Sequence, residues 1–222
     1  MKLEFFPSSS RSYEERRRRC QDESIRFDMT ADYHQFGYDY FDNSELRVGY
    51  GGYYYDGRYA GAVEKICQHY GLKPGDRVLE IGCAKGFVLV EFYKLGLKVA
   101  GLDISEYAVQ HAHSNIRRFI QVGDGCQIPF EDKSFDFVLA KEILPHIPED
   151  RVDLAISECL RVSKGAIFFE IQSGKTSLEL EDLQRWDGTH MTMRAPEWWD
   201  ALLASLGYKG DVHYNILIPE GE

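Results

Sequence analysis

The sequence predicts an α/β fold, in which a doubly wound, mostly parallel sheet carries helices on both faces and follows an N-terminal helical and aromatic cap. Three observations predict it. Strand and helix patterns alternate from Arg77 onward, the first strand runs into a glycine-rich turn, and the first 58 residues lack this alternation. We therefore expect a cap and lid at residues 1–58 and an α/β domain at residues 59–222.

The N-terminal region is polar, charged and aromatic. Residues 1–44 show no steady periodicity, and we expect one or two helices there. The segment from Gly49 to Tyr59, GYGGYYYDGRY, combines glycines with tyrosines, a composition that is typical of a mobile aromatic loop. These features predict a cover over a site on the following domain.

The α/β domain alternates strands with helices. The expected strands share apolar, β-branched or aromatic runs: VLEI at 78–81, KVAGLDI at 98–104, FIQV at 119–122, FDFVLA at 135–140, AIFFEI at 166–171 and VHYNILI at 212–218. The expected helices share apolar positions at helical spacing: Tyr59–Tyr70, Phe87–Leu95, Glu106–Ile116, Arg151–Val162 and one from Pro196 that ends before Gly207. Strands that alternate with helices run parallel and are covered on both faces, and the last strand alternates like an edge strand.

Length and composition limit the class of protein. A chain of 222 residues with 44% hydrophobic content can form one compact domain. No apolar run reaches the length of a membrane span and no signal peptide opens the chain, so we expect a cytoplasmic protein without a membrane partner. Five cysteines lie scattered without zinc-type spacing, which predicts reduced thiols and no metal site.

The net charge of −10 argues against a general nucleic-acid binder, because phosphate recognition uses dense lysine and arginine. The acidic balance instead favours a small or cationic substrate.

The first strand-to-helix turn is the expected ligand site, because open α/β sheets bind ligands beyond the carboxyl ends of their strands. This turn reads EIGCAKG, from Glu80 to Gly86. Gly82 and Gly86 let the backbone approach a ligand where a side chain would collide. The N-terminus of the next helix offers free N–H groups to an anionic group.

Asp103 ends the second expected strand, where a carboxylate can accept two hydrogen bonds from a ribose diol. The turn and the acid together predict a nucleoside ligand. The dinucleotide fingerprint needs glycine-like residues at its first, third and sixth positions, and these are Gly82, Ala84 and Phe87. Phe87 would crowd a pyrophosphate, so the spacing disfavours a dinucleotide.

At this turn the chain resembles the class I methyltransferases that depend on S-adenosylmethionine (SAM), whose first motif is an acidic residue followed by GxGxG. EIGCAKG keeps this pattern except for Ala84 in place of the middle glycine. The resemblance covers roughly Leu72 to Ile171, and includes GLDIS and VGDGCQIPFEDKSFDFVLAKEILPHI. It implies a Rossmann-like, seven-stranded, mostly parallel sheet, SAM as the cofactor and S-adenosylhomocysteine (SAH) as the product.

The resemblance also implies roles for single residues. Asp103 would bind the ribose hydroxyls, with Ile104 beside the adenine and Asp124 near the adenine amino group. The remaining residues expected to bind the cofactor belong to the same motifs: Glu80, Gly82, Cys83, Gly86 and Gly125. From the aromatic loop, Tyr54 is expected to close over the cofactor and Arg58 to pair with its methionine carboxylate.

Methyl transfer from a sulfonium is an in-line displacement, so the enzyme mainly aligns nucleophile, methyl carbon and sulfur. An amine needs no base for the attack, whereas a hydroxyl benefits from one. The segment KEILPH after the fourth strand should face the methyl donor, which makes Glu142 and His146 catalytic candidates. A second candidate is His190 in WDGTHMTMRAPEWW, where Asp187 could orient it; packing in a surface loop explains these residues equally well.

Neighbouring classes are partly excluded. The [DNS]PP[YFW] segment of DNA amino-methyltransferases is missing after strand four, and Lys141 stands where metal-dependent catechol-type enzymes place carboxylates. We expect a metal-independent enzyme that methylates an oxygen or nitrogen of a small polar molecule, with a faint resemblance to enzymes that modify sugars or amino-alcohols of surface glycans. Two alternatives stay open: a nucleotide-dependent Rossmann oxidoreductase and a non-catalytic SAM-binding subunit. The acceptor and the oligomeric state, for which a homodimer is one option, are open as well.

Overall fold

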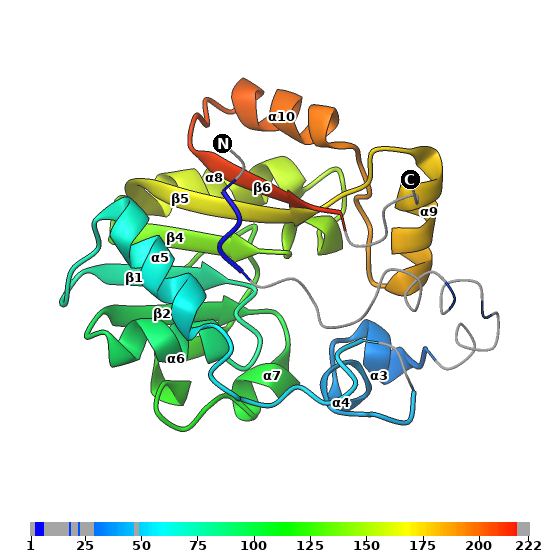
Figure 1. Cartoon of the computed structure of the whole chain (residues 1–222), viewed down its shortest axis with the longest axis horizontal. Helices are drawn as coiled ribbons and strands as arrows, with labels where there is room; N and C mark the ends of the chain where they lie inside the picture. Colours follow the sequence, from blue (N-terminus) through cyan, green and yellow to red (C-terminus); the bar gives the residue numbers. More distant parts are fainter. Residues whose placement is uncertain (1–2, 7–17, 19–21, 23–28, 47–48, 217–222) are drawn as a thin grey trace.

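The structure of the protein, a computed structural model, describes residues 3–6, 18, 22, 29–46 and 49–216. Its centre is one sheet whose strands lie in the order β3-β2-β1-β4-β5-β6 (Figure 1). The strands are β1 (Arg77–Ile81), β2 (Lys98–Asp103), β3 (Ile120–Val122), β4 (Phe135–Lys141), β5 (Ser163–Gln172) and β6 (Asp211–Asn215). Every neighbouring pair is parallel. The strand order reverses between β1 and β4, which is where such a sheet binds its ligand.

The prediction of seven strands is wrong for the part of the chain that the structure describes, which holds six. The edge position beside β5 is occupied by β6, with Phe168 opposite Asp211, so all the described strands are parallel. The last predicted strand ends at Asn215, and its final two residues, 217 and 218, lie outside the described residues.

Helices cover both faces of the sheet, as the alternation predicts. One face carries α5 (Ala60–Tyr70) and α6 (Phe87–Lys94), and the other carries α8 (Val152–Val162) and α10 (Pro196–Ser205) (Figure 1). Neighbouring residues of β1 point to opposite faces: Val78 packs in the layer of α5 and α6, and Leu79 in the layer of α8 and α10. This two-layer core fixes the carboxyl ends of the strands.

Two helices differ from the prediction. The helix expected at Glu106–Ile116 is shorter, since α7 (Glu106–Gln110) ends at His111. The chain turns there because the backbone N–H of His113 donates to the carbonyl of Lys85. Helix α9 (Ser177–Trp186) was not predicted, because most of its surface is polar; it begins at a capping box in which Thr176 and Glu179 bond each other's backbone.

The N-terminal cap contributes two short helices among the described residues, α3 (Ala31–His34) and α4 (Tyr38–Phe41). Their rings pack in one apolar cluster with Ala84 of the glycine turn and Ala108 of α7. These two helices therefore lie against the turn and against α7. No helix of the described segments is long and apolar enough to cross a membrane.

Candidate functional site

A cavity of about 980 Å³ opens at the carboxyl ends of the strands. Its wall includes residues that end β1, β2, β4, β5 and β6, residues of the cap, and the loop after α9. Ligand sites of small molecules usually measure about 300–1,000 Å³. The cavity is therefore large enough for a nucleoside ligand and a small acceptor.

The glycine turn forms the floor of this cavity beside β2. Gly82 has a φ of 70°, and its N–H donates to the carbonyl of Leu102 at 2.8 Å. A Cβ on Gly82 would lie 2.9 Å from Cβ of Ile143, which is too close. Ala84 also takes the left-handed conformation, with a φ of 48°. Glycine at position 82 is thus required by both the backbone conformation and the space.

Asp103 joins the turn to the end of β2. Its Oδ2 accepts the N–H of Ala84 at 2.6 Å, and its Oδ1 accepts the N–H of Ser105 at 2.8 Å. Burial raises the pKa of this carboxyl, and the two N–H groups oppose the shift. Each oxygen keeps a lone pair, and Asp103 lines the cavity, so the carboxylate can still accept hydrogen bonds from a diol.

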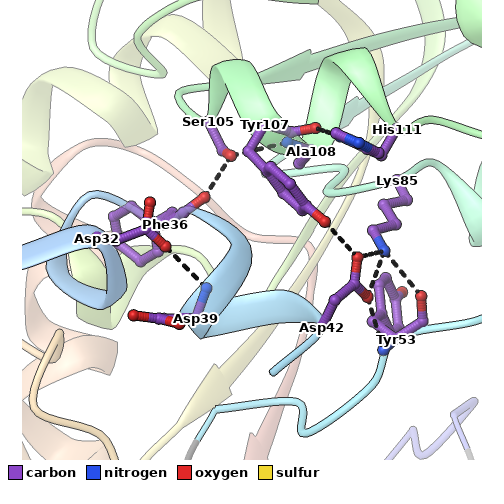
Figure 2. Close-up of polar contacts among 10 residues, drawn as sticks. All are labelled: Asp32, Phe36, Asp39, Asp42, Tyr53, Lys85, Ser105, Tyr107, Ala108 and His111. Atoms are coloured by element: carbon purple, nitrogen blue, oxygen red, sulfur yellow. Dashed lines mark hydrogen bonds and ion pairs between the residues drawn. The ribbon is translucent and has the colours of Figure 1, made fainter. Parts of the chain in front are cut away.

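The cap is attached to the turn by a partly buried ion pair (Figure 2). The ammonium of Lys85 donates to both carboxylate oxygens of Asp42 at 2.6 Å and to the carbonyl of Tyr53 at 3.0 Å. The hydroxyl of Tyr107 on α7 donates to the same carboxylate at 2.7 Å. Burial alone would raise the pKa of Asp42, but the hydrogen bonds from Lys85 and Tyr107 lower it below 3.8.

A second bond ties the cap to the start of α7. Ser105 caps α7 by accepting the N–H of Ala108, and its hydroxyl donates to the carbonyl of Phe36 at 2.5 Å (Figure 2). Phe36 itself lines the cavity. The cap residues above the site are thus held by contacts to the two segments that follow β1 and β2.

Asp124 lies farther along the same edge, after β3. Its Oδ1 accepts the N–H of Cys126 at 2.8 Å, and its Oδ2 accepts from the guanidinium of Arg151 at 2.7 Å. Burial raises the pKa of Asp124, but these two donors outweigh it and lower the value. The wall of the cavity after β2 and β3 is lined by Asp124, Gly125 and the exposed side chain of Ile104.

A buried polar group ends β4, β5 and β6. Lys141 donates to Glu142 at 2.6 Å and lies 3.3 Å from Glu170, and the amide of Asn215 donates to Glu142 at 2.7 Å. Burial would raise the pKa of Glu142, but the charge of Lys141 lowers it to about 2. Glu142 is thus an ionised carboxylate on the cavity wall that keeps a lone pair beside the bonds from Lys141 and Asn215.

A histidine cluster, formed by His146 and His190, lies where the loop after β4 meets the loop after α9. Nδ1 of His146 lies 2.9 Å from the hydroxyl oxygen of Thr189, which donates to Oδ1 of Asp187 at 2.6 Å. The hydroxyls of Tyr33 and Tyr40 in the cap donate to Asp187 at 3.0 Å. Burial and, to a lesser extent, the neighbouring His190 lower the pKa of His146 to about 4, so His146 is neutral at pH 7.

His190 lies behind His146, with ring centroids 4.7 Å apart. Its side chain is buried and does not line the cavity. The sequence suggested that Asp187 orients His190; the hydrogen bonds connect the Asp187 carboxylate to His146 instead, through Thr189.

The structure brings most of the predicted site residues to one cavity. The predicted residues on its wall are Arg58, Gly82, Asp103, Ile104, Asp124, Gly125, Glu142 and His146. Cys83 and Glu80 are buried beneath the turn, and burial raises the pKa of both side chains. A Cβ on Gly86 would meet Ile116 and Ile120, so this glycine serves helix packing.

The two predicted loop residues lie at the rim. Tyr54 is largely exposed and faces the guanidinium of Arg58, 5.9 Å from the ring centroid. Arg58 is bound to Asp56, so pairing with a ligand carboxylate would require it to leave that partner.

Sequence reasoning missed the side chains that connect distant segments. Thr189 and Asp187 lie within the segment singled out above, but their partners His146, which contacts Thr189, and Tyr33, which bonds Asp187, are far away in the chain. No sequence motif predicts the ion pair between Lys85 and Asp42 either. Only the T-x-x-E capping box at Thr176 was a local signal that could have revealed an element, α9, next to the histidine cluster.

Comparison with known proteins was made on sequence and on structure. Residues 79–169 match a family model described as a methyltransferase domain. A sterol 24-C-methyltransferase of Gibberella zeae is 39% identical over 113 residues, which are 46% of this chain and 29% of that protein. A ubiquinone biosynthesis O-methyltransferase of Agrobacterium fabrum is 26% identical over 181 residues, 69% of this chain and 72% of that protein. The match covers less than half the length of each of the first three curated relatives: 29%, 44% and 39% of those proteins.

Solved structures show the same fold. A SAM-dependent methyltransferase of Archaeoglobus fulgidus superposes with a TM-score of 0.56 at 24% identity, over 68% of this chain and 69% of that chain. A magnesium protoporphyrin IX methyltransferase of Synechocystis, solved with bound SAH, gives a TM-score of 0.51 at 21% identity, over 67% and 73%. At these identities the likeness establishes the arrangement of strands and helices.

Proposed function

We propose that this chain is a class I SAM-dependent methyltransferase that transfers a methyl group from SAM to an oxygen or nitrogen of a small polar molecule; its residues 79–169 match a methyltransferase domain, and its fold is that of a solved SAM-dependent methyltransferase. SAM is the cofactor of this domain and SAH its product. The observation that carries the proposal is Asp103, a carboxylate on the cavity wall that is hydrogen-bonded to the glycine turn at Ala84.

The residues present fit this cofactor. Gly82 presents backbone without a side chain to the cavity, and Asp103 keeps a lone pair on each oxygen for the ribose hydroxyls. Ile104 offers an exposed apolar surface to an adenine, and Asp124 can accept from its amino group. When bound, SAM supplies a methyl group on an activated sulfonium. Arg58 at the rim is the proposed partner of its carboxylate group.

Phe87 argues against the alternative of a dinucleotide oxidoreductase. Its side chain is buried and contacts the ring of Tyr53 at a centroid distance of 4.5 Å. The position that a pyrophosphate-binding turn leaves small is therefore filled by an aromatic ring.

The charge of the cavity wall favours a neutral or cationic acceptor. Acidic residues on the wall outnumber basic ones by seven to three: Glu4, Asp56, Asp103, Asp124, Glu142, Glu170 and Asp187 against Arg58, Lys141 and Arg151. An anionic acceptor would be repelled, whereas an amine or a hydroxyl would be attracted or tolerated. A sugar or amino-alcohol, such as a precursor of a surface glycan, has this character.

We place the acceptor between Glu142 and His146, because both side chains line the cavity on the β4 side of the glycine turn. His146, with a pKa of about 4, is a weak base at pH 7. Its role and that of Glu142 are therefore proposed to be binding and alignment of the acceptor. His190 is proposed to act through His146, which it contacts. A cytoplasmic location and a homodimer stay predictions of the sequence.

The test is SAH formation from SAM in the presence of small polar acceptors, first sugars and amino-alcohols and then the low-molecular-weight fraction of a cell extract. The expected result is SAH and a methylated product in equal amounts, with less of both from the Asp103→Ala variant at a SAM concentration that does not saturate it. A chain that binds SAM but yields no SAH with any fraction would instead be the non-catalytic subunit.

A further inference from the structure

We propose that His146, Asp187 and His190 form a binding site for a divalent cation of the zinc type at the acceptor end of the cavity. One donor atom from each residue lies within 4.8 Å of the other two. The cluster joins the loop after β4 to the loop after α9, and two of its members, His146 and Asp187, line the cavity. The name "acceptor end" rests on the proposed function, whereas the metal site itself does not.

The orientation of His190 leaves one nitrogen free for a metal. Its Nδ1 lies 3.1 Å from the carbonyl oxygen of Leu183. A carbonyl only accepts, so Nδ1 carries the hydrogen and Nε2 carries a lone pair. The side chain is 97% buried, since its relative exposure is 3%, and Nε2 has no hydrogen-bond partner among the described residues. A buried lone pair without a donor is costly unless it binds something.

His146 is oriented in the same way. The single hydroxyl hydrogen of Thr189 is donated to Asp187, so the hydroxyl oxygen accepts from Nδ1–H of His146. Nε2 of His146 therefore also carries a lone pair. Histidines that bind metals typically donate their other N–H to a carbonyl, a carboxylate or a group bound to one. Both imidazoles already have such partners, Leu183 and Thr189.

Asp187 supplies the negative charge that a cation needs. It is a buried carboxylate whose side-chain partners are all neutral, namely the hydroxyls of Tyr33, Tyr40 and Thr189. No lysine or arginine within the described ranges forms an ion pair with it. Buried charges are normally paired or bound to a metal, and a divalent cation would provide that partner.

The ligand set selects the type of ion. Two imidazoles and one carboxylate suit zinc and its neighbours rather than magnesium or calcium, which prefer oxygen. Three protein ligands leave a fourth position open, as in catalytic zinc sites. Zinc bonds of roughly 2.0–2.2 Å place tetrahedral ligands roughly 3.4 Å apart, so the side chains must approach one another when the ion binds. The open position would face the acceptor.

The experiment uses the whole chain, dialysed against a chelator and then titrated with Zn²⁺ by calorimetry. We expect one equivalent to bind, with affinity at least 100-fold weaker in the His190→Ala variant. The matched control is His111→Ala, because that exposed histidine donates to the carbonyl of Tyr107 and lies outside the cluster. Equal Zn²⁺ binding by the unmodified chain and the His190→Ala variant would overturn the proposal, as would no binding at all.

A second measurement needs no variant. Co²⁺ in place of Zn²⁺ should give the intense visible absorption bands of a four- or five-coordinate ion with nitrogen ligands, and only the weak bands of a six-coordinate ion would contradict the site. The inference and the proposed function can fail separately. A chain that converts SAM to SAH equally well without metal and binds no Zn²⁺ keeps the function and loses the site. A chain that binds Zn²⁺ but not SAM keeps the metal site and loses the proposed function.

Discussion

The cofactor end and the acceptor end of the cavity are built in different ways. At the cofactor end, carboxylates accept backbone N–H groups from nearby residues: Asp103 from Ala84 and Ser105, and Asp124 from Cys126. At the acceptor end, side chains bond side chains across the chain, and the Tyr33 hydroxyl reaches Asp187 over 154 positions. A site of the first kind depends on the parallel pairing of β1 and β2 and on the turns that follow them, whereas the second depends on the docking of the cap.

The largest expected effect concerns the acceptor end. The Asp187→Ala variant would leave the buried hydroxyls of Tyr33, Tyr40 and Thr189 without their acceptor. Because each unsatisfied group costs roughly 1–3 kcal/mol, we expect the free energy of unfolding to fall by about 3–5 kcal/mol. Urea denaturation measures it. The control is the exposed Asp150→Ala, expected to stay within about 0.5 kcal/mol, and a similar loss in both variants would refute the role of the network.

The next effect tests the backbone of the cofactor end. Gly82→Ala combines a left-handed conformation with a contact of 2.9 Å to Cβ of Ile143. We expect a loss of about 2–4 kcal/mol in unfolding free energy. Gly71→Ala is the matched control, since it has a similar φ of 66° and no atom within 4 Å of the added Cβ. It should lose only about 1–2 kcal/mol, and equal losses would show that space at Gly82 is unimportant.

A smaller effect is expected on the cofactor itself. Asp103→Ala removes the proposed ribose contact, worth roughly 1.5–3 kcal/mol for a hydrogen bond to a charged group. Calorimetry should therefore show SAM affinity reduced about 10–100-fold. Asp103→Asn, which keeps one acceptor oxygen, should fall between. Unchanged affinity in the alanine variant would remove Asp103 from the proposed contact.

The smallest effect concerns the ion pair between Lys85 and Asp42, which attaches the cap to the glycine turn. Asp42→Asn weakens the bond to Lys85 and should reduce the unfolding free energy by about 1–2 kcal/mol at neutral pH. The folded-state pKa of Asp42 is lowered below 3.8, so its stabilisation is present above that value and is lost as pH falls through the folded pKa. The difference between variant and unmodified chain should therefore shrink below about pH 4. A difference that is constant down to pH 2 would contradict the ion pair.

The same contrast explains what the sequence could predict. The glycine turn and Asp103 were placed together correctly because β1 and β2 are parallel neighbours, with Ile81 opposite Leu102. Local patterns also predict five of the six helices that span five residues or more in the described part of the chain. The polar helix α9 was missed, and α7 was predicted too long because its end is set by a bond from His113 to Lys85, which no periodicity records.

The acceptor end could not be predicted in this way. His146 and His190 were identified as candidates, but their connection depends on Thr189, which has no distinctive pattern. The seventh strand came from the family resemblance, and among the described strands β6 occupies the edge in parallel to β5. Non-local side-chain contacts and the edge of the sheet are set by tertiary packing, which spacing along the chain does not encode.

Titration calorimetry of the unmodified chain with SAM and with NADH tests the central claim most directly. We expect SAM to bind at one site per chain while NADH gives no heat, because Asp103 and the bare backbone of Gly82 fit a single nucleoside and Phe87 fills the space of a pyrophosphate. Binding of NADH without binding of SAM would contradict it.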